Sequence, residues 1–217
     1  MSDLELEKLI QQAPSTLDRF RLDNKTAIMV GGNQGLGQAM AMALAAAGAD
    51  VCIVARGPKG LKETADAITG LGRKGTYIAA DVTDENQVEK MVETVMETYG
   101  AIDILVNSQG TVELQPTHEF DTEAWQRVID VNLKSLFLCC KHVGRHMLNQ
   151  GKGKIINISS VRGFQGRAQD PAYAPSKGAV NQLTHSLAIE WGPKGINVNG
   201  IAPVFTKTPM GLTVLND

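Results

Sequence analysis

Short apolar runs, typical of buried strands, alternate along this chain with longer stretches of helix-forming composition. The apolar runs predict strands near 26–31, 51–55, 76–80, 103–107, 154–159 and 196–201. The stretches between them predict helices near 35–47, 58–70, 84–99, 122–149 and 172–191. This alternation predicts an α/β fold in which helices cover both faces of a doubly wound parallel sheet.

One domain is expected for a chain of 217 residues, which is long enough to bury a sizeable core. Residues 1–20 precede the first predicted strand and look amphipathic, so they are expected to form an amino-terminal extension. This extension could be an arm, a packing helix or a disordered tail. Residues 21–217 make up the domain itself, without a repeat or a low-complexity segment.

Composition narrows the function classes. Hydrophobic residues make up 43% of the chain and charged residues 20%, as in ordinary globular proteins. The net charge of −2 gives no sign of a nucleic-acid-binding surface, and no apolar run approaches the ~20 residues of a membrane span. The amino terminus is acidic and lacks the pattern of a secretory signal, so a cytoplasmic protein is expected.

The cysteines are odd in number, with Cys52 in a predicted strand and Cys139 and Cys140 in a predicted helix. We expect buried free thiols in a reducing compartment, because disulfides are rare there and apolar surroundings suit a thiol. The Cys and His spacing does not suit zinc, so no metal is expected.

A glycine-rich turn joins the first predicted strand to the first predicted helix. Its sequence is Gly31-Gly32-Asn33-Gln34-Gly35-Leu36-Gly37. Glycines let the backbone approach a pyrophosphate closely, and the helix amino terminus presents free N–H groups to it. Strand, turn, helix and strand in this order are the context of a dinucleotide-binding turn, so residues 21–217 are expected to form a Rossmann-like dinucleotide-binding domain.

Tyr173 and Lys177 share one face of a predicted helix, and Ser160 lies upstream at the end of a predicted strand. The ammonium group is expected to lower the pKa of the phenol from its ordinary value of about 10. Such a phenol suits general acid–base catalysis on an alcohol, and the serine hydroxyl would hold the substrate oxygen. Taken alone, the Tyr-x-x-x-Lys pair is also compatible with an ordinary surface helix.

These motifs, together with others in the same order and spacing, resemble the short-chain dehydrogenase/reductase family from about Leu22 to Thr208. The resemblance rests on the G-x-x-x-G-x-G turn and on Asp81-Val82, Asn107, Gly110, Asn132, Ser160, Tyr173, Lys177 and the segment Asn197-Val198-Asn199-Gly200-Ile201-Ala202-Pro203. Two departures stand out. Ser108-Gln109 replaces the middle pair of the family's Asn-Asn-Ala-Gly, and Val204 replaces the glycine that normally follows the proline.

The resemblance implies a catalytic tetrad. Tyr173 would be the general acid or base, Lys177 would lower its pKa, Ser160 would bind the reacting oxygen, and Asn132 would support a water-mediated proton relay; Ser159 would be a packing neighbour. The resemblance also implies cofactor contacts from Gly31, Asn33, Gln34, Gly35, Leu36, Gly37, Arg56, Asp81, Val82, Asn107, Gly110, Tyr173, Lys177, Pro203 and Thr208.

Arg56 bears on the choice of cofactor. It follows the second predicted strand, and Ala55 stands where an acidic residue would bind the ribose 2′-hydroxyl of NAD. A guanidinium pairs with the 2′-phosphate that a carboxylate would repel, so NADP(H) is favoured, with Lys59 and Lys62 as further cations. NAD(H) stays possible, since Gln34 replaces a basic residue usual in the family's turn, and a solvated surface arginine is the alternative interpretation.

We therefore expect an NAD(P)-dependent oxidoreductase (EC 1.1.1.-) that transfers a hydride between nicotinamide and a secondary alcohol or ketone. The nearest resemblance is to gluconate and related polyol dehydrogenases. Polar residues between the serine and the tyrosine (Arg162, Gln165, Arg167 and Gln169) favour a sugar, polyol or sugar acid, although surface exposure or subunit contacts explain them equally well. The alternatives are a 3-oxoacyl-thioester reductase and a non-catalytic cofactor-binding or scaffold protein.

Family members usually continue for roughly 30 residues beyond the end of this chain, with a last helix and strand. Those elements are therefore expected to be missing here, which is the main support for a scaffold or a truncated chain. The family also implies a homodimer or a homotetramer, formed through the two long helices that contain Asn132 and Tyr173.

Overall fold

Six parallel strands form one sheet at the centre of the protein, in the order β3-β2-β1-β4-β5-β6. The computed structural model describes residues 18–215, so most of the predicted extension at 1–20 lies outside the described residues. The strands are β1 (Thr26–Val30), β2 (Asp50–Ala55), β3 (Gly75–Ala79), β4 (Ile104–Asn107), β5 (Gly153–Ile158) and β6 (Ile196–Ile201). The predicted Rossmann-like doubly wound sheet is confirmed.

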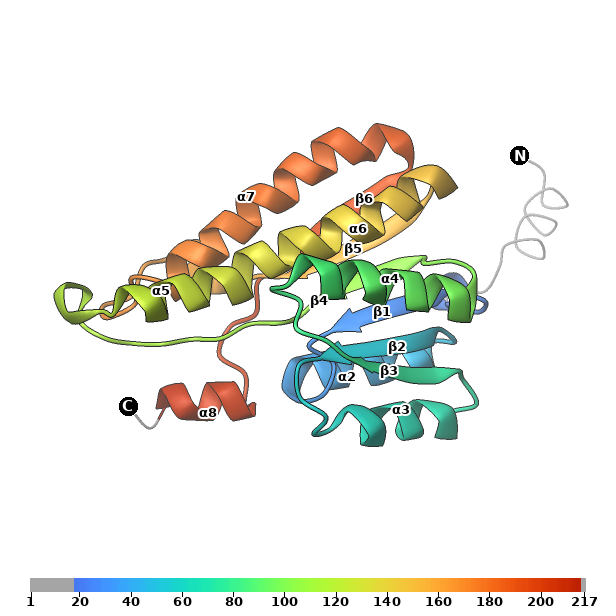
Figure 1. Ribbon diagram of the computed structural model, residues 1–217, viewed down its shortest axis with the longest axis horizontal. Helices are drawn as coiled ribbons and strands as arrows, with labels where there is room; N and C mark the ends of the chain where they lie inside the picture. Colours follow the sequence, from blue (N-terminus) through green and yellow to red (C-terminus); the bar gives the residue numbers. More distant parts are fainter. Residues whose placement is uncertain (1–17, 216–217) are drawn as a thin grey trace, which may run out of the picture.

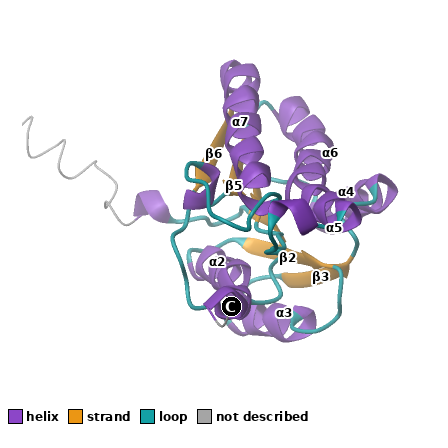
Figure 2. Cartoon of the chain, turned by 90° about the vertical axis from the view of Figure 1, so that its left-hand side faces the viewer, coloured by secondary structure: helices purple, strands orange, loops and turns teal. Residues whose placement is uncertain are grey.

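Helices cover both faces of this sheet. Figures 1 and 2 show α2 and α3 on one face and α4, α6 and α7 on the other. The helices are α2 (Gly35–Ala46), α3 (Leu61–Gly70), α4 (Glu85–Tyr99), α5 (Thr122–Ile129), α6 (Ser135–Gln150), α7 (Tyr173–Trp191) and α8 (Pro209–Leu215). The sequence did not predict α8, the short helix that follows the last strand.

The continuous apolar runs at β1, β2 and β4 are explained by burial of these central strands on both faces. In β1, Ile28 and Val30 enter the core beneath α4, α6 and α7. Ala27 and Met29 enter a second core beneath α2 and α3. Successive side chains of a strand point to opposite faces of the sheet. A strand in which apolar and polar residues alternate would therefore bury polar side chains in one of these two cores.

The predicted helix 122–149 is wrong in one respect, because it is not continuous. The α-helix ends at Ile129, a π-helical turn runs over Asp130–Lys134, and α6 then begins at Ser135. π-helical turns inside α-helices are rare and occur frequently at functional sites. Here the turn contains Asn132, which is completely buried and faces α7.

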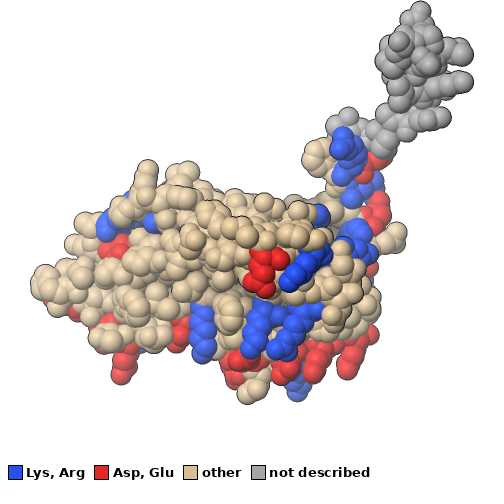
Figure 3. Space-filling model, turned by 90° about the horizontal axis from the view of Figure 1, so that it is seen from above, with Lys and Arg blue, Asp and Glu red and all other residues tan. Residues whose placement is uncertain are grey.

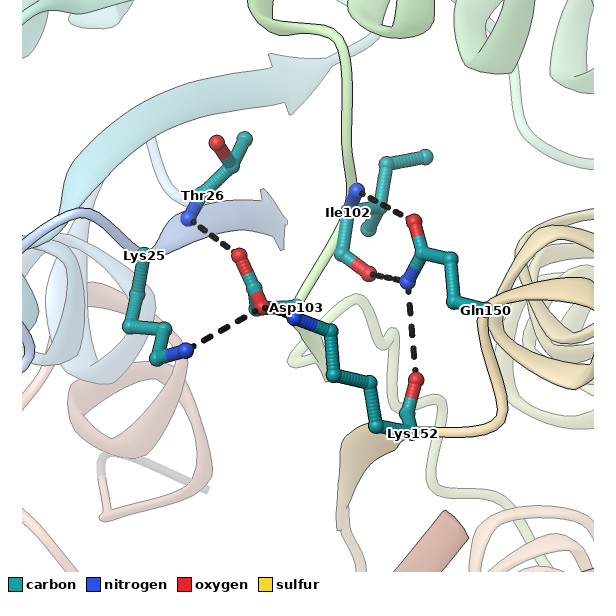
Figure 4. Close-up of polar contacts among 6 residues, drawn as sticks. All are labelled: Lys25, Thr26, Ile102, Asp103, Gln150 and Lys152. Atoms are coloured by element: carbon teal, nitrogen blue, oxygen red, sulfur yellow. Dashed lines mark hydrogen bonds and ion pairs between the residues drawn. The ribbon is translucent and has the colours of Figure 1, made fainter. Parts of the chain in front are cut away.

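Polar contacts join the chain at the amino-terminal edge of the sheet (Figure 4). The buried Asp103 carboxylate accepts a hydrogen bond of 3.1 Å from the backbone N–H of Thr26 and lies 3.5 Å from the Lys25 ammonium. The Gln150 side-chain amide bonds both the N–H and the carbonyl oxygen of Ile102. These contacts stabilise the edge at which the strands begin. The loops at the opposite edge, where the strands end, are therefore available to form a site.

Candidate active site

A cavity of about 510 Å³ opens where the strands end at their carboxyl-terminal edge. Ligands of open α/β sheets bind at this edge, and the volume is in the range of small-molecule sites. The predicted site residues that line the cavity are Gly31, Asn33, Gln34, Gly35, Leu36, Gly37, Arg56, Asp81, Val82, Gly110, Ser160, Tyr173, Lys177, Pro203 and Thr208. Asn107 and Asn132 do not line it and lie behind its wall.

The glycine turn forms one end of the cavity. Gly31 and Gly35 have positive φ angles of 78° and 56°, which disfavour other residues. A side chain at Gly37 would overlap the carbonyl oxygen of Gly31, so the turn and the first turn of α2 can pack together only without one. The residue before α2, Gln34, provides no side-chain cap, and the first N–H groups of this helix are therefore available to a phosphate. This geometry fits a dinucleotide.

Beyond the turn, polar groups from β2 and β3 complete this end of the cavity. Asp81 accepts hydrogen bonds from the backbone N–H and the hydroxyl of Thr83, which fixes its carboxylate at the end of β3. Arg56 is exposed, lines the cavity and forms no ion pair with another described residue. Lys62, by contrast, is paired with Asp66 at 2.6 Å, so one of the two further cations suggested by the sequence is engaged elsewhere.

Tyr173, Ser160 and Lys177 meet at the other end of the cavity. Tyr173 begins α7, and a hydrogen bond links its phenol to the Ser160 side chain. Lys177 follows one turn later; it is only 4% exposed, and its Nζ donates a 2.8 Å hydrogen bond to the carbonyl oxygen of Ile158. The Tyr-x-x-x-Lys pair is therefore part of a buried site rather than of a surface helix.

The expected pKa of Tyr173 needs a correction. Burial raises the pKa of the phenol above its ordinary value of 10, and the nearby Asp170 carboxylate raises it further. The hydrogen bond with Ser160 and the charge of Arg162 lower this pKa, but they do not reverse the effect. Burial also lowers the pKa of Lys177, to about 8, because the charged ammonium has lost its hydration. Lys177 lies 5.7 Å from the centre of the tyrosine ring.

Asn132 supports this end of the cavity from behind. Its Nδ2 donates to the carbonyl oxygen of Thr111 (3.0 Å) and to Oγ of Ser176 (2.9 Å), and its Oδ1 accepts from the Thr111 N–H (2.8 Å). The π-helical turn is thereby joined both to α7 and to the loop after β4. The proton relay that the family resemblance implies for Asn132 stays a prediction.

Asn107 is also internal. Its Nδ2 donates to Oδ1 of Asn157 (2.9 Å), and Asn157 in turn donates to Oγ1 of Thr184 (3.0 Å). These residues connect β4, β5 and α7 through the core, so the Asn107 side chain holds elements together instead of facing the cavity. Sequence reasoning missed Asn157, although an asparagine inside an otherwise apolar strand was a signal of a buried polar partner.

Both middle residues of the segment that departs from the family pattern, Ser108 and Gln109, line the cavity. The Gln109 side chain donates a 2.9 Å hydrogen bond to Oγ of Ser135 at the start of α6. Among the loop residues between Ser160 and Tyr173, Arg162 and Arg167 line the cavity, whereas Gln165 and Gln169 do not. Asp170 lines it as well and was missed, because nothing in the sequence distinguished it from a solvated loop carboxylate.

The segment after β6 returns to the glycine turn. The carbonyl oxygen of Pro203 accepts a hydrogen bond from the N–H of Val161, and Val204 lines the cavity beyond it. Thr208 lies beside Gly35, and its hydroxyl accepts from the N–H of Gly211 in α8. Val204, which replaces the glycine of the family pattern, is therefore part of the cavity wall between the glycine turn and the catalytic residues.

Comparison with known proteins agrees with this geometry. The family model of the short chain dehydrogenases matches residues 25–216. The chain belongs to the short chain dehydrogenase family. It is therefore an oxidoreductase, as predicted, and the non-catalytic alternative is not supported. Among residues 18–215, no helix combines the length and the apolar character needed to cross a membrane.

Similar proteins within the family include sugar-acid enzymes. The chain is 43% identical to 2-dehydro-3-deoxy-D-gluconate 5-dehydrogenase of Bacillus subtilis, over 88% of this chain and 74% of that protein. It is 36% identical to cis-4-hydroxycyclohexanecarboxylate dehydrogenase of Sinomonas cyclohexanicum, over 86% and 75% of the two chains. The crystal structure of gluconate 5-dehydrogenase from Burkholderia cenocepacia, in complex with NADP and tartrate, superposes with a TM-score of 0.88 at 36% identity, covering 93% of this chain and 79% of that one. The predicted likeness to gluconate-type dehydrogenases is confirmed.

Because Lys177 is buried, the stability difference between the wild type and the variant Lys177→Met is expected to depend on pH. Below pH 8 the folded protein carries the full cost of a buried ammonium; between pH 8 and the unfolded value of 10.5 the folded state releases the proton that the unfolded chain retains. Stability of the wild type therefore rises with pH across this window. We expect Lys177→Met to be more stable by on the order of 3 kcal/mol at pH 7, and this difference to shrink by pH 10.

Denaturant unfolding of both proteins at pH 7, 8, 9 and 10 measures this difference. The variant Lys62→Met is the control, since Lys62 is exposed and paired only with Asp66. A stability difference for Lys177→Met that does not change with pH contradicts the expected titration.

Proposed function

We propose that the protein oxidises a secondary alcohol of a sugar acid or polyol, or reduces the corresponding ketone, with NADP(H) as its preferred cofactor. The observation that carries this proposal is one cavity with a glycine turn and Arg56 at one end and Tyr173 with Ser160 and Lys177 at the other. A dinucleotide extends between two such ends in proteins of this fold. When bound, the nicotinamide supplies or accepts the hydride.

The protein's own residues move the proton. Tyr173 gives the proton of its phenol to the substrate oxygen in reduction and takes it back in oxidation. Ser160 accepts a 3.1 Å hydrogen bond from the backbone N–H of Arg162. Its own hydroxyl proton, which is directed to the Tyr173 phenol in the free protein, would turn to the substrate oxygen when substrate binds. The Lys177 ammonium donates one N–H to the carbonyl oxygen of Ile158. Its two other N–H groups are available to the Tyr173 phenol and to a ribose hydroxyl of the cofactor.

Two arginines support a sugar acid as the substrate. Arg162 and Arg167 line the cavity, and neither guanidinium forms an ion pair with a described residue. A guanidinium binds a carboxylate through paired hydrogen bonds, so either one could hold the acid group of a substrate whose alcohol reacts at Tyr173. A 3-oxoacyl thioester, the alternative substrate, could use the apolar residues of the lining, such as Val112, Leu114 and Phe205, but would leave both guanidinium groups without a carboxylate.

We also propose that the protein forms homo-oligomers in the cytoplasm. The surface above α7 shows few charged side chains (Figure 3), and α7 contains only one exposed charged residue, Glu190. Ile189 on the same helix is 79% exposed and would add apolar area to a subunit contact on this weakly charged surface. The buried thiols of Cys52, Cys139 and Cys140 support a reducing compartment.

The catalytic role of Tyr173 is tested by Tyr173→Phe. We expect kcat for D-gluconate oxidation to fall by roughly 10³-fold, because the proton acceptor is lost while the cavity keeps its shape. Binding of NADPH, followed by nicotinamide fluorescence, should stay within a factor of about 3. Retained turnover in this variant refutes the mechanism.

The cofactor preference is tested by titrating the wild type, Arg56→Ala and Lys62→Ala with NADPH and NADH. Loss of a charge-assisted contact with the 2′-phosphate should weaken NADPH binding about 10- to 100-fold in Arg56→Ala and leave NADH binding almost unchanged. Lys62→Ala serves as the matched control, because Lys62 is engaged with Asp66. Equal effects of Arg56→Ala on both nucleotides count against NADP(H).

The oligomer is tested by light scattering on the wild type and on Ile189→Glu. A charge placed in an apolar interface is costly, so we expect the wild type to be a dimer or tetramer and the variant to dissociate. Ser186→Glu, on the exposed surface of the same helix, tests whether the effect is specific to the isoleucine. A monomeric wild type contradicts the proposed assembly.

A further inference from the structure

Asp170 is an unusual residue in the loop between Ser160 and Tyr173. Residues 164–169 are exposed, whereas Asp170 is only 7% exposed and lines the cavity next to Tyr173. Aspartate is almost never buried to this extent without a partner, because desolvation of the carboxylate is costly. The question is therefore which groups satisfy its two oxygens.

One of these oxygens has a partner in the protein. Oδ1 accepts a 3.0 Å hydrogen bond from the backbone N–H of Ala174, in the first turn of α7. This contact caps the helix, and the negative charge is favourable at a helix amino terminus. Oδ2 accepts no hydrogen bond from a described residue. Because Asp170 lines the cavity, this oxygen is available to a ligand there.

The arginines nearby do not neutralise this carboxylate. Arg162 and Arg167 line the same cavity, but neither lies within ion-pair distance of Asp170 among the described residues. The guanidinium of Arg162 donates instead to the carbonyl oxygen of Gly166, at 3.4 Å. The substrate end of the cavity therefore contains separate positive and negative groups rather than an internal ion pair.

The backbone on both sides of Asp170 is fixed in place. The preceding residue, Gln169, adopts a left-handed conformation with φ of 60°, and its carbonyl oxygen accepts a 2.9 Å hydrogen bond from the N–H of Gln115. The carbonyl oxygen of the following residue, Pro171, accepts a 3.1 Å hydrogen bond from the indole N–H of Trp125 in α5. A left-handed conformation outside glycine costs free energy, and such strain is typical of positions with a functional constraint.

We propose that Asp170 determines substrate specificity, by accepting through Oδ2 a hydrogen bond from a hydroxyl group on a carbon near the one that reacts. A hydroxyl donor satisfies the buried carboxylate, whereas a C–H group at the same place leaves it without a partner. The residue therefore selects polyhydroxy substrates over alcohols with a single hydroxyl. This inference rests on the proposed function and specifies what the cavity recognises besides the acid group.

The test compares two acids, each with a secondary alcohol to oxidise. D-gluconate has hydroxyl groups beside the reacting carbon, and cis-4-hydroxycyclohexanecarboxylate has none. We expect the wild type to have the higher kcat/KM for D-gluconate. In Asp170→Ser, the shorter side chain no longer presents an acceptor to the substrate, so the ratio of the two kcat/KM values should fall about 10-fold or more, and any loss of the contact with Ala174 appears as a lower melting temperature.

Two further variants separate recognition from stability. Gln165→Ala changes an exposed residue of the same loop that does not line the cavity, and it should leave the ratio as in the wild type. Asp170→Asn keeps the cap and removes the charge beside Tyr173, whose other charged neighbours are Arg162 and Lys177. The negative charge opposes ionisation of the phenol, so in this variant the rising limb of kcat/KM against pH should move to lower pH.

The outcomes are distinct. A lower ratio in Asp170→Ser, with a melting temperature close to that of the wild type, supports the proposal. Equal losses for both acids leave the ratio unchanged, which means that Asp170 only caps α7 and overturns the proposal. A wild type that prefers the monohydroxy acid also overturns it. A wild type that oxidises neither acid refutes the proposed function together with this inference, whereas oxidation of both with the same ratio in all variants refutes this inference alone.

Discussion

The burial of one ammonium group determines how the catalytic end of the cavity is built. Lys177 has lost nearly all contact with solvent, and its Nζ is held by the backbone carbonyl oxygen at the end of β5. An ammonium in this position is costly unless other polar groups remain available to it. Its free donors therefore face the cavity, where a substrate or a cofactor hydroxyl would satisfy them.

The polar residues behind the cavity wall keep this arrangement in register. Asn132 connects the π-helical turn with α7 through Ser176, and Asn157 connects β5 with the same helix through Thr184. Both asparagines are completely buried, and each uses its amide to join elements that are distant in sequence. Hydrogen bonds of this kind are directional, unlike apolar contacts, so they fix the rotation of α7 and with it the positions of Tyr173 and Lys177.

The sequence predicted the fold closely because its signals are local. Continuous apolar runs mark strands that are buried on both faces, and the glycines of the turn are required by backbone geometry at Gly31 and Gly37. The π-helical turn was not predictable, because its hydrogen-bond shift depends on contacts of Asn132 with α7 that no local pattern encodes. Asp170 was missed for a similar reason, since its burial follows from tethers to Gln115 and Trp125 elsewhere in the chain.

The direction of the pKa shift at Tyr173 has a consequence for the pH dependence of catalysis. Sequence reasoning considered only the attraction between a phenolate and Lys177, whereas burial penalises the phenolate and the charge of Asp170 adds to the penalty. Without ligands, the phenol therefore keeps its proton at neutral pH and stands ready to act as a general acid. Reduction of a carbonyl group needs the phenol in this state, while oxidation of an alcohol needs the phenolate. The rate of oxidation is therefore expected to rise with pH above neutrality, as the phenol ionises.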